Sequence, residues 1–231
     1  MSLRRVVIGS VATVLVGAGG VAITGLILSN AGSQAAPLSA TVDGTAQTSQ
    51  GSSLPHAFLK LATYPDSAQG VHGKDGGAHP GWVTYGPTSQ LRVPAHALVT
   101  VTIDQYDSGG TITNPFFATV RGTVGGTETV NGKTISKVDP DSVGHTFTLH
   151  ALPTNQDPLF VNVPLPALPD SAQPAPGALY AKPNVVTFSF ITGGKGDYVW
   201  NCEYPCGDGY YASFGGPMST RGYMSGTLTV V

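Results

Sequence analysis

The sequence predicts an all-β protein with a Greek-key sandwich or barrel architecture, and three features of the chain predict it. Its 31 glycines and 18 prolines interrupt the chain too often for long helices in the main domain. Short runs alternate between apolar and polar residues, as in strands that bury one face. Asn131-Gly132 lies between two such runs and is a strong signal for a two-residue hairpin.

The first element is an apolar segment near the N-terminus. Arg4 and Arg5 precede a run from Val6 to Leu28 that has no charged residue. Such a run is long enough to cross a hydrocarbon core of roughly 30 Å as a helix. Because the arginines precede it, the rest of the chain is expected outside the cytoplasm, in the periplasm or on the cell surface. We therefore expect residues 1–28 to form a transmembrane anchor; the alternative is a signal peptide cleaved after Ala35, which releases a secreted protein.

The next residues, 29–55, are expected to form a flexible linker, because they are rich in small and polar residues and poor in large apolar ones. The remainder, 56–231, is expected to fold as one domain that buries a sizeable core. Charged residues make up only 10% of the chain and the net charge is −2, which leaves no basic surface for nucleic acid.

The clearest strand of this domain is Leu98–Asp104, where Val99, Val101 and Ile103 alternate with polar residues and are expected to face inward. Residues 57–62 are expected to form a short edge strand. The other expected strands, in chain order, are 82–85, 90–93, 116–121, 127–130, 133–136, 145–149, 159–163, 185–191, 198–202 and 223–231.

The C-terminal part of the chain brings together sulfur-containing side chains. Tyr198 and Trp200 alternate so that Cys202 lies on the same face, at the end of a strand. A loop with Cys206 follows, and the closing strand begins near Met224. Cysteine and methionine sulfurs suit copper, so this arrangement predicts a site for one soft metal ion.

These segments resemble cupredoxins. Cys202, its loop and the closing strand resemble the C-terminal ligand loop of that family, and Ser142-Val-Gly-His145-Thr-Phe-Thr resembles the segment that supplies its first histidine. In the blue-copper members the resemblance implies His145, Cys202 and Met224 as ligands. The second histidine of that set has no counterpart, because no histidine follows His150.

The loop itself resembles that of the copper A domain of cytochrome c oxidase subunit II. Cys202-Glu-Tyr-Pro-Cys206-Gly-Asp-Gly-Tyr210 is similar to the Cys-x-x-x-Cys-Gly-x-Gly-His pattern, with Tyr210 in place of the histidine and Ser213 in place of the methionine. The resemblance implies copper as the cofactor, electron transfer or copper handling as the function, and a redox partner or respiratory oxidase subunit as the partner.

The candidate metal ligands are thus His145, Cys202, Cys206 and Met224. A disulfide between Cys202 and Cys206 is the alternative, since thiols outside the cytoplasm oxidise unless a metal protects them. In that case the domain is a metal-free interaction or structural module closed by the disulfide. The sequence leaves both interpretations open, and no nucleophile and base pair indicates an enzyme.

Overall fold

The computed structural model describes residues 36–48, 51–65, 82–155, 157–169, 171, 182–207 and 212–231. The expected membrane anchor, residues 1–28, lies outside these ranges. Within them, no helix combines the length and the apolar character needed to cross a membrane. The described residues form thirteen strands and a few short 3-10 helices. The prediction of an all-β domain is therefore confirmed.

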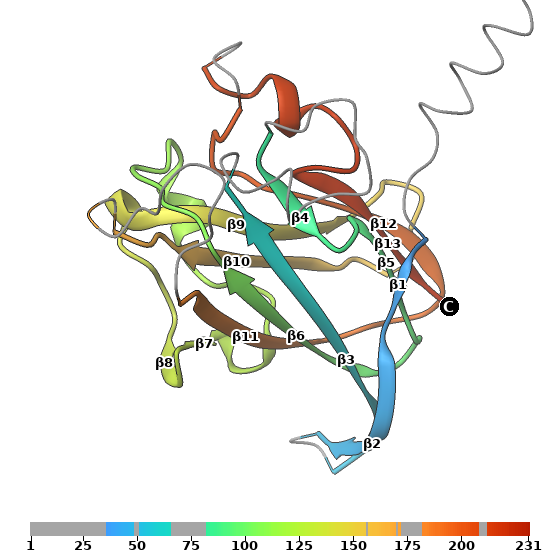
Figure 1. Ribbon diagram of the computed structural model, residues 1–231. Helices are drawn as coiled ribbons and strands as arrows, with labels where there is room; N and C mark the ends of the chain where they lie inside the picture. The colour runs from blue at the N-terminus through green and yellow to red at the C-terminus, as the bar shows by residue number, and fades with distance from the viewer. Residues whose placement is uncertain are drawn as a thin grey trace, which may run out of the picture. The chain divides into compact units, whose positions relative to one another are not determined.

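The strands form two sheets (Figure 1). The first has the order β1 (Leu38–Ser39), β5 (Gln90–Val93), β13 (Ser225–Val230), β12 (Gly196–Asn201), β9 (Val143–Ala151) and β10 (Phe160–Pro166). The second has the order β2 (Thr41–Gln47), β3 (Ser53–Tyr64), β6 (Leu98–Gln105), β11 (Asn184–Ile191), β7 (Glu128–Val130) and β8 (Lys133–Ile135), and β4 (Thr84–Gly86) pairs with β3. Because β5 and β6 lie in different sheets, as do β11 and β12, the chain crosses repeatedly between the layers.

An aromatic core joins the two sheets. Phe147 of β9 and Phe188 of β11 belong to different sheets, and their ring centroids are 5.6 Å apart. Trp200 of β12 lies 5.1 Å from Phe147 and 4.8 Å from Tyr85, measured between ring centroids. Its indole N–H donates a hydrogen bond of 2.9 Å to the carbonyl of Ser89. Each aromatic pair adds about 0.5–1.5 kcal/mol beyond burial of its area, so the end of β12 is held firmly.

Several local predictions are confirmed. In β6, Val99, Val101 and Ile103 are fully buried while the intervening residues are partly exposed. The strands β7 and β8 pair as a hairpin around Asn131 and Gly132. Both turn residues have positive φ, 51° and 83°, which is the conformation that an Asn-Gly turn of this kind requires.

The prediction of a flexible linker at residues 29–55 is partly wrong, because β1, β2 and the start of β3 lie within this range. β2 pairs with β3 and β1 pairs with β5 through backbone hydrogen bonds. Nearly all side chains of β2 are exposed, so pairing with β3 and not burial keeps this segment in the sheet. A polar composition therefore does not distinguish such an edge strand from a linker.

The prediction of a short edge strand at 57–62 is also wrong, both in the length of the strand and in its position in the sheet. The strand β3 has twelve residues and lies between β2 and β6. Its residues Ala57, Leu59 and Leu61 are buried in the core, because pairing on both sides places this strand inside the sheet.

The strand expected at 116–121 is instead a short 3-10 helix, Pro115–Ala118, with isolated bridges at Thr119 and Arg121. Asn114 caps it through its side chain, which accepts a hydrogen bond of 3.1 Å from the Phe116 N–H. A proline at the first helical position and an asparagine cap favour helical turns over an extended strand.

Candidate metal centre

His145 and Cys202 lie at the same end of the first sheet. The start of β9 and the end of β12 are neighbours because the two strands pair antiparallel, with Asn201 opposite Thr148. The Nδ1 atom of His145 is 3.8 Å from the Sγ atom of Cys202, and the two residues are 1% and 0% exposed. His150 lies further along β9 and is half-buried, so the two histidines have different surroundings.

Cys206 completes a group of three donor atoms. Its Sγ atom lies 3.9 Å from that of Cys202, and both cysteines are free thiols in the structure. A disulfide bond has a sulfur–sulfur distance of about 2.05 Å, so the two sulfurs are in contact but not bonded. The donor atoms of His145, Cys202 and Cys206 all lie within 4.8 Å of one another. The clustering that a metal site requires is present.

A methionine sulfur lies next to this group, and it belongs to Met218. The Sδ atom of Met218 is 3.1 Å from the Cys206 Sγ atom, in the short 3-10 helix η6 (Gly216–Met218). Met224, the methionine expected from the sequence, is fully buried in the core, and its backbone carbonyl accepts a hydrogen bond of 2.8 Å from the Cys202 N–H. Met224 is thus beside Cys202, but the close sulfur contact is made by Met218.

The separations of Cys202 from His145 and from Cys206 match the donor spacing around one tetrahedral metal ion. Metal–thiolate bonds of about 2.3 Å and metal–imidazole bonds of about 2.0 Å place tetrahedral donor atoms about 3.5–3.8 Å apart. The observed separations are 3.8 Å for His145 and Cys202 and 3.9 Å for the two cysteines. The Cys206–Met218 distance of 3.1 Å is shorter than this spacing, so the two sulfurs are in direct contact and would have to move apart to bind the same ion.

In the metal-free site the lowered pKa of Cys202 favours metal binding, whereas the protons held by His145 and Cys206 compete with a metal ion. Burial alone would lower the pKa of His145, but hydrogen bonds and negative charge from Asp107 and Cys202 raise it to about 9. Burial would raise the pKa of Cys202, but hydrogen bonds from Cys206, His145 and the Thr146 N–H hold it well below its usual value. Burial and the neighbouring Cys202 thiolate raise the pKa of Cys206 well above its usual value. These shifts favour the thiolate form of Cys202 over that of Cys206.

Neighbouring backbone and aromatic groups hold Cys202 in place. The Thr146 N–H donates to the Cys202 Sγ atom at 3.3 Å. The buried hydroxyl of Tyr85 donates to the Thr146 carbonyl at 2.9 Å. The position of Cys202 is therefore fixed by β9 and by the aromatic core, whereas Cys206 and Met218, both half-buried, lie beyond the end of β12.

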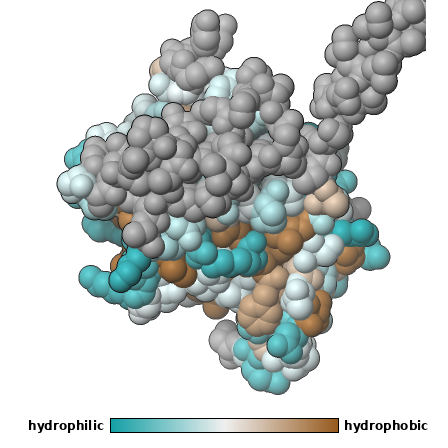
Figure 2. Space-filling model, in the orientation of Figure 1, coloured by the Kyte–Doolittle hydropathy of each residue, from teal (hydrophilic) through white to brown (hydrophobic). Residues whose placement is uncertain are grey.

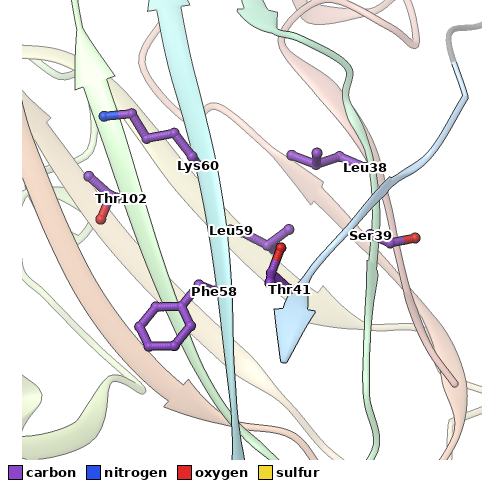
Figure 3. A pocket seen from close by; sticks show the side chains of 7 residues that line it. All are labelled: Leu38, Ser39, Thr41, Phe58, Leu59, Lys60 and Thr102. Atoms are coloured by element: carbon purple, nitrogen blue, oxygen red, sulfur yellow. The ribbon is translucent and has the colours of Figure 1, made fainter. Parts of the chain in front are cut away.

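A separate surface groove contributes no metal ligand. On the face shown in Figure 2, apolar areas alternate with hydrophilic ones. The groove in Figure 3 encloses about 490 Å³ between β3, β6 and the β1–β2 segment. Its cationic side chain, Lys60, extends over β6 and forms an ion pair of 2.5 Å with Asp104. None of its lining residues is one of the four candidate ligands.

Two residues of this site were missed by reasoning from the sequence, Met218 and Asp107. Met218 stands in a Gly-Pro-Met turn with no strand periodicity, and only the presence of a methionine in the C-terminal loop was a signal. Asp107 follows β6 in an acidic loop, a pattern far more common in turns than in sites. Tyr210, the expected substitute for the copper A histidine, lies outside the described residues.

Comparison with known proteins gives only remote similarity. No protein-family model matches the chain, and no curated protein matches it. Among solved structures, auracyanin B is 12% identical, with a TM-score of 0.33, covering 83% of this chain and 97% of that one. Reduced rusticyanin is 13% identical, with a TM-score of 0.31, covering 76% and 84%. A second rusticyanin structure, described as a copper protein, is 14% identical, with a TM-score of 0.30, covering 82% and 88%. Likeness at this level decides neither the fold family nor the function.

Proposed function

We propose that this cupredoxin-like domain binds one copper ion through His145, Cys202, Cys206 and Met218 and serves in one-electron transfer or copper handling. The observation that supports the proposal is the convergence of an imidazole nitrogen and two thiol sulfurs within 4.8 Å. A thioether sulfur 3.1 Å from one thiol supplies a fourth donor. Thiolate and thioether ligands together with imidazole suit copper better than magnesium, calcium or manganese.

The ligand set favours one copper ion over the two of a copper A centre. Two bridging thiolates in the copper A pattern are accompanied by further histidines, and His145 is the one histidine within the described cluster. Bound copper would supply the Cu(II)/Cu(I) redox couple, which accepts and donates one electron. His145 and Cys202, fixed at strand ends, would keep their positions in both states, which favours fast electron transfer.

The proposed setting is the outer face of a membrane. The charge-free run of residues 6–28 after two arginines supports an anchor with the folded domain outside the cytoplasm. A redox partner such as a respiratory oxidase subunit is the proposed partner, based on the copper A resemblance of the cysteine loop. Full-length protein that stays with membranes after carbonate washing would support the anchor. A released mature form beginning near Ala36 would instead indicate a cleaved signal peptide.

Metal analysis combined with thiol titration tests the copper site. Protein purified under reducing conditions and loaded with copper should contain about one copper per chain, with thiolate-to-copper absorption in the visible range. His145→Gln should lose this binding, whereas His150→Gln, on the same strand but outside the cluster, should keep it. Protein that has neither copper nor a titratable thiol would be the disulfide-closed, metal-free module, and the copper proposal would be wrong.

A further inference from the structure

The side chain of His145 has a second partner on the side away from the thiols. Its Nε2 atom lies 3.0 Å from the Oδ2 atom of Asp107, while its Nδ1 atom lies 3.8 Å from the Cys202 Sγ atom. The side chains of His145 and Asp107 are 1% and 14% exposed. A carboxylate accepts only, so the Nε2 atom carries the proton that is donated to Asp107. In the neutral imidazole the lone pair then lies on the Nδ1 atom, on the side of the ring that faces the Cys202 Sγ atom.

Asp107 is held rigidly by hydrogen bonds to its other atoms. The Ser108 N–H donates to its Oδ1 atom at 2.8 Å, and its own N–H donates to the side-chain oxygen of Gln105 at 2.9 Å. Its carbonyl accepts from the Gln105 side-chain amide at 3.0 Å and from the Leu168 N–H at 2.9 Å. The position of Asp107 is therefore fixed by contacts that do not involve His145.

Gln105 is itself fixed in a buried position. It is 0% exposed at the end of β6, and its side-chain oxygen also accepts a hydrogen bond from the Thr63 hydroxyl of β3. Two neighbouring strands of the second sheet, β3 and β6, thus support Asp107. Through Asp107 they orient a histidine that belongs to the first sheet.

We propose that Asp107 is a positioning residue for the metal site, which fixes the orientation and tautomer of His145 and adds a negative charge behind it. This inference rests on the proposed function. Histidine ligands that donate their second N–H to a carboxylate become more basic, and loss of such a partner costs about 10–100-fold in metal affinity. Negative charge close to the metal stabilises Cu(II) more than Cu(I), so Asp107 lowers the reduction potential.

Two substitutions separate the hydrogen bond from the charge. Asp107→Ala removes both, and we expect full-length protein to lose about 10–100-fold in copper affinity. Asp107→Asn keeps an oxygen acceptor of the same shape but removes the charge. We expect it to lose less affinity and to have a higher reduction potential than the wild type. Affinities are measured for Cu(I) and Cu(II) separately by competition with chromophoric chelators, and potentials by redox titration of the visible absorption.

Asp104→Asn is the matched control. It removes the same charge from β6, but Asp104 pairs with Lys60 and makes no described contact with His145. It should leave both the affinity and the potential as in the wild type. A shift in potential in this control equal to that of Asp107→Asn would contradict a local role for Asp107. A copper affinity and a reduction potential equal to those of the wild type in both Asp107 variants would also contradict this role.

A readout in the metal-free protein is independent of copper. Nitrogen-15 chemical shifts of the His145 ring, recorded above pH 9 where the imidazole is neutral, should show the proton on Nε2 in the wild type. In Asp107→Ala we expect a mixture of both tautomers. An unchanged tautomer would overturn the positioning role. Failure of wild-type protein to bind copper in the assays above, with Nε2 protonation intact, would instead refute the proposed function alone.

Discussion

The Sγ atom of Cys206 lies 3.1 Å from the Sδ atom of Met218, which stands twelve residues later in the chain. This contact closes the loop after β12 onto the candidate metal centre. It makes Met218 a candidate thioether ligand in addition to Met224. The other methionine of the domain, Met224, is part of the hydrophobic core.

The first prediction distinguishes the two methionines. Met218→Leu should weaken Cu(I) binding, because leucine has a similar volume but no sulfur donor. Met224→Leu should leave copper binding unchanged and alter the free energy of unfolding by less than about 1.5 kcal/mol, as for other volume-conserving core changes. Chelator competition and urea unfolding measure the two effects. The opposite pattern, with binding lost only in Met224→Leu, would return the ligand role to the residue expected from the sequence.

The second prediction concerns Gly144, which precedes His145. A Cβ atom built at this position would lie 2.2 Å from the side-chain nitrogen of Gln105. Gly144→Ala should therefore displace Gln105, destabilise the protein by about 1–3 kcal/mol and weaken copper binding through Asp107. Thermal unfolding and copper titration check both effects.

Gly196→Ala serves as the control for that substitution. Gly196 begins β12, and a Cβ atom there would meet nothing closer than 3.6 Å. We expect this variant to bind copper like the wild type and to be at least as stable. Equal losses in the two variants would show that the tight packing around Gly144 has no specific role.

The third prediction is a pH dependence of folding caused by Glu128. This residue is 2% exposed, and among the described residues neither carboxyl oxygen has a hydrogen-bond partner. Burial raises its pKa from 4.5 to about 9. Between these values the folded state binds a proton that the unfolded state releases. The contribution of Glu128 to the free energy of unfolding should therefore be largest below about pH 4.5. It should fall by up to about 1.4 kcal/mol per pH unit as the pH rises toward 9.

Glu128→Gln tests this dependence, because glutamine is uncharged at every pH and has a similar shape. Urea unfolding between pH 5 and 8 should show a smaller decline in the variant, with the largest gain over the wild type at pH 8. Parallel curves for the two proteins would mean that the Glu128 carboxyl reaches water when it ionises.

The fourth prediction is that copper affinity increases with pH. Copper must displace protons from His145, whose pKa is raised to about 9, and from Cys206, whose pKa is raised by burial and by the Cys202 thiolate. Between pH 6 and 9 the apparent affinity should rise about tenfold per pH unit for each proton released. Cys206→Ser should show a shallower slope as well as weaker binding. A pH-independent affinity would show that metal binding releases no proton.

Local features of this fold follow from sequence patterns. Alternation decided that the β6 side chains Val99, Val101 and Ile103 face the core, because the two faces of a strand are set by neighbours along the chain. The dipeptide Asn131-Gly132 predicted a hairpin, because the turn needs positive φ at two successive positions and few other residue pairs adopt it. Cys202 was likewise placed by its spacing from aromatic residues of the same strand.

The residues that surround these positions come from distant parts of the chain, and sequence patterns did not predict them. Met218 contacts Cys206 from a short 3-10 helix without strand periodicity, and Asp107 contacts His145 from a loop that follows a strand of the opposite sheet. The strand β2 belongs to the domain through pairing with β3, although its polar composition resembles a linker. Such contacts depend on how two sheets pack and which backbone groups they pair, and the periodicity of a single strand contains no information about either.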